Sequence, residues 1–290
     1  MKKKIIALIF LAALCLSTTS VYADVAAGDI IVCLGNNLSE TEKQQMLDEF
    51  NAPEDAQQVI VTNEEEYQYL GDYISASHIG SKAISSAMIE YTEEGSGLNI
   101  DVSDKINYIT DDIYRNALMT AGVKDADIKV SAPISVSGTA ALTGIMKAYE
   151  ISTGKPISEE VKQVANEEMI KTAELGDAIG NEDKAADIMN EIKAQIASEK
   201  PKTTEEVRDI VNDVLKKHDL NLTDEQKEKL VSLFDRMKDM NINWDQVSNQ
   251  LSGILDKASD YLSSDKAQSF LQKFEDGFGS FVNWLAGLFG

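Results

Sequence analysis

Two histidines, His78 and His218, are the strongest general-base candidates in this sequence. They share neither the H-E-x-x-H spacing nor any other spacing that is typical of a metal site. His78 follows three small residues in a stretch that we expect to be a loop, and a serine such as Ser137 could act as its nucleophilic partner. No G-x-S-x-G elbow surrounds Ser137. His78 and Ser137 are therefore catalytic candidates to which no motif assigns a role.

Carboxylates are numerous, with 49 Asp and Glu residues, so pairs at glycosidase-like separations arise by chance and none can be singled out. The sequence contains no EF-hand loop, no phosphate-binding GxxxxGK[ST] and no GxGxxG. Cys33 lies in the apolar run Ile30–Leu34 and is predicted to be a buried, inert thiol. We therefore expect no metal site, no disulfide and no cofactor.

The stretch from Asp127 to Ile151 predicts a strand, a tight turn and a helix. The turn, Ser137-Gly138-Thr139, could offer backbone N–H groups to an anion at the start of the helix. An ordinary N-cap with a packing glycine explains the same residues, and we favour that interpretation. Gly144, inside the helix, is expected to permit close helix–sheet contact.

The region that positions these residues mixes strands and helices between Gly28 and Gly154. Residues 82–91 and 98–102 are expected to pair as a hairpin, because the segment between them is rich in turn-forming residues. After Gly154-Lys155-Pro156 only helical patterns follow. The predicted fold class is α+β: a mixed α/β N-terminal domain with a small sheet at residues 24–155, followed by an all-helical C-terminal half at 156–290.

The N-terminus has the pattern of a secretory signal peptide over residues 1–23. Lys2 to Lys4 form a basic segment, Ile5 to Leu16 form a short apolar run, and Val21-Tyr22-Ala23 precedes the expected cleavage site. We expect a secreted, extracellular protein of a Gram-positive cell envelope.

The formal net charge of -22 predicts a strongly acidic surface. It argues against nucleic acid as a partner, because phosphate binding requires clustered Lys and Arg. It argues less strongly against a membrane surface.

The C-terminal tail has an apolar, aromatic stripe and no charged residue from Gly277 to Gly290. Such a face must be buried against something. The alternatives are docking on the same chain, a protein partner or self-association, and a membrane interface anchored by an amphipathic helix. The predicted interaction residues are Phe274, Phe278, Phe281, Trp284, Leu285, Leu288 and Phe289.

Several segments together resemble a known family. They are residues 136–144, followed by Lys147-Ala148-Tyr149-Glu150, with Leu34-Gly35, Ser85-Ser86-Ala87 and Asn116-Ala117-Leu118 in support. The chain resembles the secreted Gram-positive proteins of domain-of-unknown-function family 1002 over most of its length. The resemblance implies an exported protein, and it implies no activity and no catalytic residues.

The hypothesis that follows is a secreted or envelope-associated binding protein without enzymatic activity. One alternative is an extracellular hydrolase acting on cell-wall material through His78 and a serine or carboxylates. Another is a membrane-surface-active protein that uses its C-terminal helix.

Overall fold

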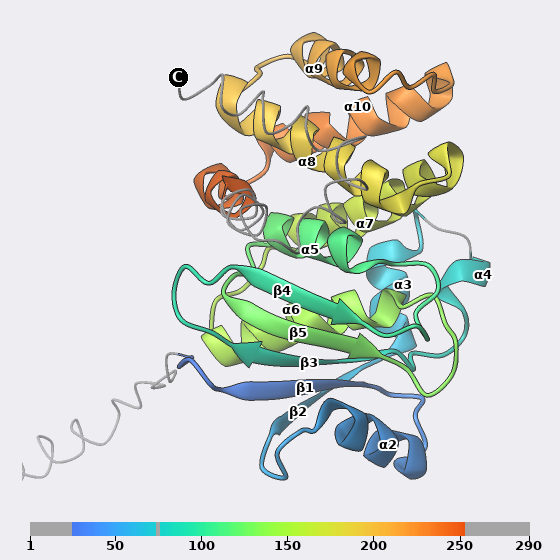
Figure 1. Cartoon of the computed structure of the whole chain (residues 1–290), viewed down its shortest axis with the longest axis vertical. Helices are drawn as coiled ribbons and strands as arrows, with labels where there is room; N and C mark the ends of the chain where they lie inside the picture. The colour runs from blue at the N-terminus through green and yellow to red at the C-terminus, as the bar shows by residue number, and fades with distance from the viewer. Residues whose placement is uncertain (1–24, 74–75, 253–290) are drawn as a thin grey trace, which may run out of the picture.

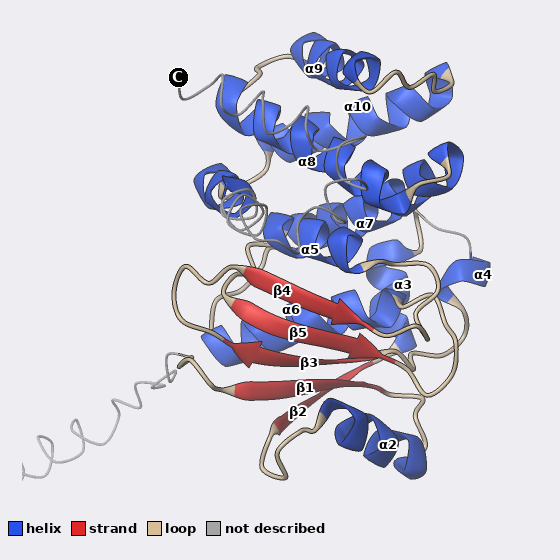
Figure 2. Cartoon of the chain, in the orientation of Figure 1, coloured by secondary structure: helices blue, strands red, loops and turns tan. Residues whose placement is uncertain are grey.

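The computed structural model of the chain describes residues 25–73 and 76–252, and of residues 77 and 78 it describes only the backbone. The predicted α+β class is confirmed, with one five-stranded sheet in the N-terminal half and helices in the C-terminal half (Figures 1 and 2). The strands are β1 (Ile30–Gly35), β2 (Gln57–Val61), β3 (Ser86–Tyr91), β4 (Leu98–Val102) and β5 (Ala126–Ser131). The helices among them are α2 (Glu40–Phe50), α3 (Asn63–Leu70), α4 (Ala76–Ile79), α5 (Asp111–Thr120) and α6 (Thr139–Thr153).

The strand order is β2-β1-β3-β5-β4, with β1–β2 and β4–β5 parallel and β1–β3 and β3–β5 antiparallel. The predicted hairpin is therefore wrong, because β5 lies between β3 and β4. The connection from β3 to β4 is held by Asp125, whose Oδ1 accepts 3.0 Å hydrogen bonds from the N–H groups of Gly95 and Gly97. Asp125, directly before β5, thus holds the connection that passes from β3 to β4 on the other side of β5. Turn-forming residues occur in such a connection and in a hairpin, so their presence in the sequence does not distinguish the two topologies.

Both faces of the sheet carry buried side chains. On one face, Cys33 and its neighbours pack against α6, and on the other Val32, Leu34 and Met88 pack against Met46 and Phe50 of α2. Figure 1 shows α6 behind the sheet and α2 beside β2. Burial of β1 on both faces explains why its sequence is continuously apolar.

The helical half consists of α7 (Glu159–Ile179), α8 (Glu182–Glu199), α9 (Thr204–Lys217) and α10 (Asp224–Asp239), and residues 244–252 are helical. Capping boxes at Thr203/Glu206 and Thr223/Gln226 start α9 and α10. α5 packs on α7 and α8, so one hydrophobic cluster continues from the sheet into the helical half.

A buried polar network crosses this junction. Lys193 Nζ of α8 lies 2.7 Å from Glu168 Oε1 of α7, and both side chains are fully buried. The ammonium also donates to the Asn116 carbonyl of α5 at 3.0 Å, and Thr120 Oγ1 donates to Glu168 Oε2 at 2.5 Å. The network thus connects α5, α7 and α8, and removing one of its charged members would leave the other charge buried without a partner.

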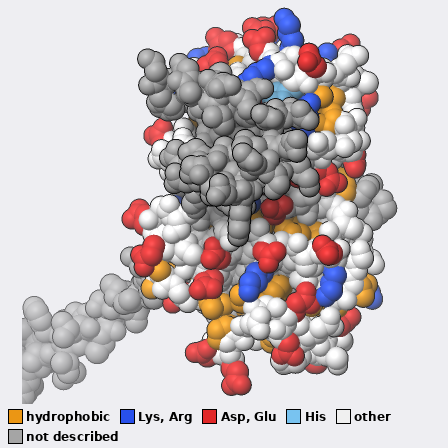
Figure 3. Space-filling model, in the orientation of Figure 1, with side chains coloured by type: hydrophobic (Ala, Val, Ile, Leu, Met, Phe, Trp, Pro, Cys, Tyr) orange, Lys and Arg blue, Asp and Glu red, His pale blue; other side chains and the backbone are white. Residues whose placement is uncertain are grey.

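Acidic side chains are scattered over both halves of the face in Figure 3, as the net charge requires. In the described part of the chain, no helix is long and apolar enough to cross a bilayer.

Candidate functional site

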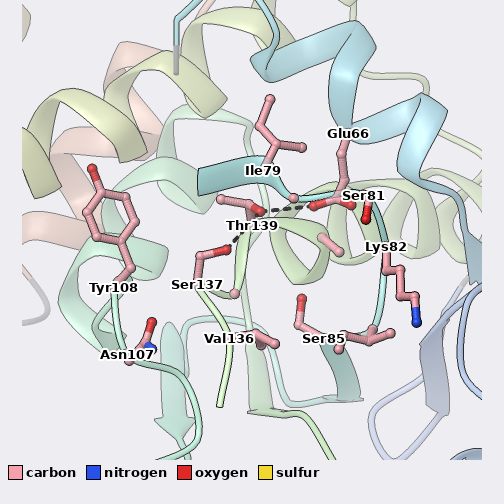
Figure 4. A pocket seen from close by; sticks show the side chains of 14 residues that line it. Glu66, Ile79, Ser81, Lys82, Ser85, Asn107, Tyr108, Val136, Ser137 and Thr139 are labelled. Carbon is pink, nitrogen blue, oxygen red and sulfur yellow. Dashed lines mark hydrogen bonds between the residues drawn. The ribbon is translucent and has the colours of Figure 1, made fainter. Parts of the chain in front are cut away.

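A pocket of about 590 Å³ opens at the N-terminal end of α6 (Figure 4). We call it the α6 pocket. Its walls come from α3, the end of α4, the segment before β3, the segment before α5 and the turn that leads into α6. Its lining residues are Glu66, Ile79, Gly80, Ser81, Lys82, Ile84, Ser85, Asn107, Tyr108, Val136, Ser137, Gly138, Thr139 and Ala140.

The turn at the base of the α6 pocket depends on Gly138. Its φ is +97°, and a Cβ atom there would collide with the Tyr114 hydroxyl and with Ile106. The buried Tyr114 hydroxyl donates a 2.5 Å hydrogen bond to the Gly138 carbonyl. Gly138 is itself the N-cap of α6 and packs against Tyr114 and Ile106, which agrees with the favoured interpretation of the turn as an N-cap with a packing glycine, although the cap residue has no side chain to accept a hydrogen bond. The turn instead leaves its hydroxyl groups for other contacts.

β5 also ends earlier than the sequence pattern predicts. It stops at Ser131, and of the residues that follow only Val136 forms an isolated bridge, to Ile106. Pro133 explains the difference, because proline cannot donate to a sheet ladder. The end of the resulting loop, from Val136 to Gly138, contributes to the lining of the α6 pocket.

Glu66 is the charged group at the centre of the α6 pocket. A capping box formed by Thr62 and Glu65 starts α3. Glu66 and the buried Leu70 lie on the same face of this helix, because they are four residues apart. Glu66 is 1% exposed, and its carboxylate accepts hydrogen bonds from Thr139 Oγ1 at 2.9 Å and Asn63 Nδ2 at 3.1 Å. Burial raises the pKa of Glu66 to about 7, and the two hydrogen bonds offset only part of that effect.

A chain of hydroxyl groups extends from Glu66 into the α6 pocket. Thr139 Oγ1 donates to Glu66, and Ser137 Oγ lies 3.3 Å from Thr139 Oγ1 (Figure 4). Ser85 lies on another wall, where its Oγ accepts the Ala141 N–H at 3.1 Å and so fixes the first turn of α6. The arrangement presents several neutral donors and acceptors beside one carboxyl group that is protonated over part of the physiological range.

The rim of the α6 pocket combines an aromatic ring with polar groups. Tyr108 is half-buried, and burial raises the pKa of its hydroxyl to about 12, so the group stays neutral. Asn107 is exposed and donates to Ser135 Oγ at 3.1 Å. Lys82 is the one cation of the lining, and Figure 4 shows its side chain directed away from Glu66.

The structure places Ser137 in the α6 pocket, whereas His78 lies in the short helix α4 and not in a loop as expected. The side chain of His78 is outside the described residues, although Ile79 and Gly80 after it line the pocket. His218 caps the C-terminus of α9, with Nε2 2.8 Å from Glu191 Oε2 of α8, so it belongs to a helix–helix contact. The predicted interaction residues of the tail, between Phe274 and Phe289, are also outside the described residues.

Glu66 was not predicted, because it ends a run of three glutamates on a short helix. One signal was available: Glu66 and Leu70 are four residues apart, so a carboxylate shares the apolar face of the helix. Cys33 is buried as predicted. Its Sγ donates to the Gly144 carbonyl at 3.1 Å, and burial raises the pKa of its thiol to about 12.

Gly144 has the expected role of close contact, because a Cβ atom there would lie 3.0 Å from the Cβ of Cys33. Among the described residues, no group of three or more His, Cys, Asp or Glu side chains has the geometry of a metal site.

Comparisons with known proteins agree with the family resemblance. Residues 34–254 match the family described as "Protein of unknown function (DUF1002)". The chain is 50% identical to the "Uncharacterized protein YpuA" of Bacillus subtilis (strain 168) over 291 residues, which covers 100% of both chains. No solved structure matches the chain.

Proposed function

The chain belongs to the DUF1002 family, a family of unknown function, and on that premise we propose that it is an exported, non-enzymatic protein that binds a small saccharide in the α6 pocket. The proposal rests on one observation. Glu66, a residue that is 1% exposed, lines this pocket among hydroxyl groups, and its burial makes the ionised carboxylate costly to stability. An ionisable group that lowers the stability of the folded state and lines a cavity is a candidate for ligand binding.

The lining of the α6 pocket favours a ligand rich in hydroxyl and amide groups. Its volume of about 590 Å³ falls in the range of small-molecule sites, roughly 300–1,000 Å³. Apart from Glu66 and Lys82, its polar groups are the uncharged side chains of serine, threonine, asparagine and tyrosine. Such groups donate and accept hydrogen bonds to sugar hydroxyl and amide groups, while the ring of Tyr108 offers an apolar surface for a sugar ring.

The setting is a cell envelope, where wall saccharides are available. The basic segment Lys2–Lys4, the apolar run Ile5–Leu16 and the Ala23 cleavage site support export. The acidic chain, with a formal charge of -22, argues against nucleic acid as the ligand.

Calorimetric titration with peptidoglycan fragments, released from walls by a muramidase, tests the proposal. We expect saturable binding by the parent protein and a loss of at least about tenfold in affinity for Glu66→Gln and Thr139→Val, because each removes a polar contact at the centre of the pocket. Glu64→Gln is the matched control, since Glu64 is an exposed glutamate on the same helix. Equal affinities in the parent, Glu66→Gln and Thr139→Val would contradict the assignment.

A second candidate function is hydrolysis of cell-wall material, and the hydrogen-bonded series Ser137–Thr139–Glu66 is the observation that favours it. With a pKa of about 7, Glu66 could accept a proton that is relayed from Ser137 through Thr139. Binding remains the better supported function. Glycoside hydrolysis usually requires two carboxyl groups, and the lining contains one.

Analysis of the fragments after long incubation separates the two functions. Unchanged fragments support binding alone, whereas cleavage that disappears in both Ser137→Ala and Glu66→Gln would establish hydrolysis.

The C-terminal tail supports a further element of the proposal, namely contact with a protein partner, a second copy or a membrane surface. The uncharged sequence from Gly277 to Gly290, with Trp284 among its aromatic residues, is the supporting observation. Deletion of residues 277–290 is expected to abolish association with cells or oligomers. Unchanged fractionation and unchanged molecular size would contradict that expectation.

A further inference from the structure

A second pocket, of about 630 Å³, lies in the helical half where the C-terminal ends of α8 and α10 meet the start of the helix at 244–252. We call it the lysine pocket. It shares no lining residue with the α6 pocket. Its lining residues are Ile196, Lys200, Pro201, Lys202, Lys238, Asn241, Ile242, Asn243, Trp244 and Asp245.

The lysine pocket has a charge opposite to that of the chain as a whole. Three lysines and one carboxylate line it, whereas the chain has 27 Lys and Arg against 49 Asp and Glu. Lys238 is already paired, with its Nζ 3.2 Å from Asp235 and 2.5 Å from Asp239. The ammonium groups of Lys200 and Lys202 form no ion pair with a residue that the structure describes, although the Glu206 carboxylate accepts the Lys202 N–H and interacts electrostatically with the Lys202 charge. Two cationic groups are therefore available to a ligand.

The backbone at Lys200 gives an independent reason to look for a ligand. Lys200 ends α8 in the left-handed conformation, with φ +51°. The other non-glycine residues with positive φ in the described chain are Asn51, Asp125 and Asp219, which are types that tolerate this conformation. Helix dipoles favour a cation near the ends of α8 and α10. The helix dipole does not explain why position 200 is a lysine, because a glycine there would adopt the left-handed conformation without strain. Backbone strain of this kind is concentrated at functional sites.

The remaining wall of the lysine pocket is apolar and aromatic. The half-buried Trp244 lies with Ile196 and Ile242, and the exposed Asn241 and Asn243 supply amide groups. A purely inorganic ion would leave this wall without a contact. A ligand with a charged end and a flat carbon skeleton would use both the lysines and the indole ring.

We propose that the lysine pocket binds a small organic anion, whose phosphate or carboxylate group contacts Lys200 and Lys202 and whose ring packs on Trp244. This site is separate from the saccharide site. Lysine acts on an oxyanion as a point charge, so both anionic groups suit it.

Fluorescence titration of full-length protein carrying Trp284→Phe tests the proposal, because Trp244 is then the one remaining tryptophan. The probes are phenyl phosphate and benzoate, with phenol and inorganic phosphate as the ring-only and anion-only comparisons. We expect saturable quenching by at least one of the two aromatic anions and weaker binding of both comparison probes. Added salt should weaken the binding, since the lysines are exposed.

The double variant Lys200→Gln/Lys202→Gln is expected to lose at least about tenfold in affinity. Lys216→Gln/Lys229→Gln is the matched control, because it removes two exposed lysines outside the pocket and changes the net charge equally. Glu66→Gln should leave this binding unchanged. Calorimetry with the same probes detects binding that leaves fluorescence unaltered. Equal affinity in the two double variants, or no binding of either aromatic anion by both methods, would overturn the proposal.

Discussion

Replacing Glu66 by glutamine should stabilise the protein at alkaline pH, because it removes a buried charge and keeps the shape of the side chain. Burial raises the pKa of Glu66 from 4.5 to about 7 in the folded state. Each pKa unit corresponds to about 1.4 kcal/mol, so the ionised carboxylate lowers the free energy of unfolding by about 3 kcal/mol at pH 8. Glutamine should recover most of this amount, provided that the Asn63 amide rotates so that its oxygen accepts the new N–H.

The sign of the pH dependence follows from the raised pKa. The protonated carboxyl favours the folded state, so its stabilising contribution is complete below pH 4.5 and is lost as the pH rises through about 7. The advantage of Glu66→Gln should therefore be near zero at pH 4.5 and reach its full value of about 3 kcal/mol by pH 8.

Urea unfolding of the parent and of Glu66→Gln at these two pH values measures the difference directly. Glu64→Gln controls for the loss of one acidic group from an acidic surface, because Glu64 is exposed, and it should change stability little. A gain for Glu66→Gln that is equal at both pH values, or a loss at pH 8, would refute the argument that Glu66 is a costly buried charge.

Three further predictions concern the packing of the fold. Lys193→Met leaves the buried Glu168 without its charge partner and should lower the free energy of unfolding in urea by about 3–5 kcal/mol. The double variant Lys193→Met/Glu168→Leu should lower it by less, and a single variant as stable as the parent would contradict the pairing. Gly138→Ala should lower the free energy of unfolding by more than Gly180→Ala, because both glycines have positive φ but only the Cβ at 138 would meet neighbouring atoms; equal losses would contradict the need for close packing there. In protein lacking residues 1–23, the buried thiol of Cys33 should react with a thiol reagent only as fast as the protein unfolds, and rapid labelling under native conditions would show that the thiol is accessible.

The helix boundaries were largely predictable because local chemistry determines them. The Ser39/Glu42, Thr203/Glu206 and Thr223/Gln226 capping boxes all start helices. The pairing of strands was not predictable in the same way. Only contacts between distant segments place β5 between β3 and β4, and turn-forming residues at 93–97 suit either topology.

The α6 pocket was predictable in position but not in content. The strand–turn–helix pattern led to Ser137 and Thr139, which do line it. Glu66, Ser85 and Tyr108 come from three other segments, and the sequence alone contains no signal that those segments meet there. The pKa of Glu66 depends on its burial, which is a property of the packed structure.

The most direct test of the saccharide site is residue-resolved NMR titration of the protein with peptidoglycan fragments. Binding in the α6 pocket should shift the backbone amide signals of Gly138, Thr139 and Ala140 and that of Ser85 before others, because these residues line the pocket. The same shifts should weaken in Glu66→Gln and persist in Glu64→Gln. Fragments that shift only signals remote from these residues, or none at saturating concentration, would contradict the account.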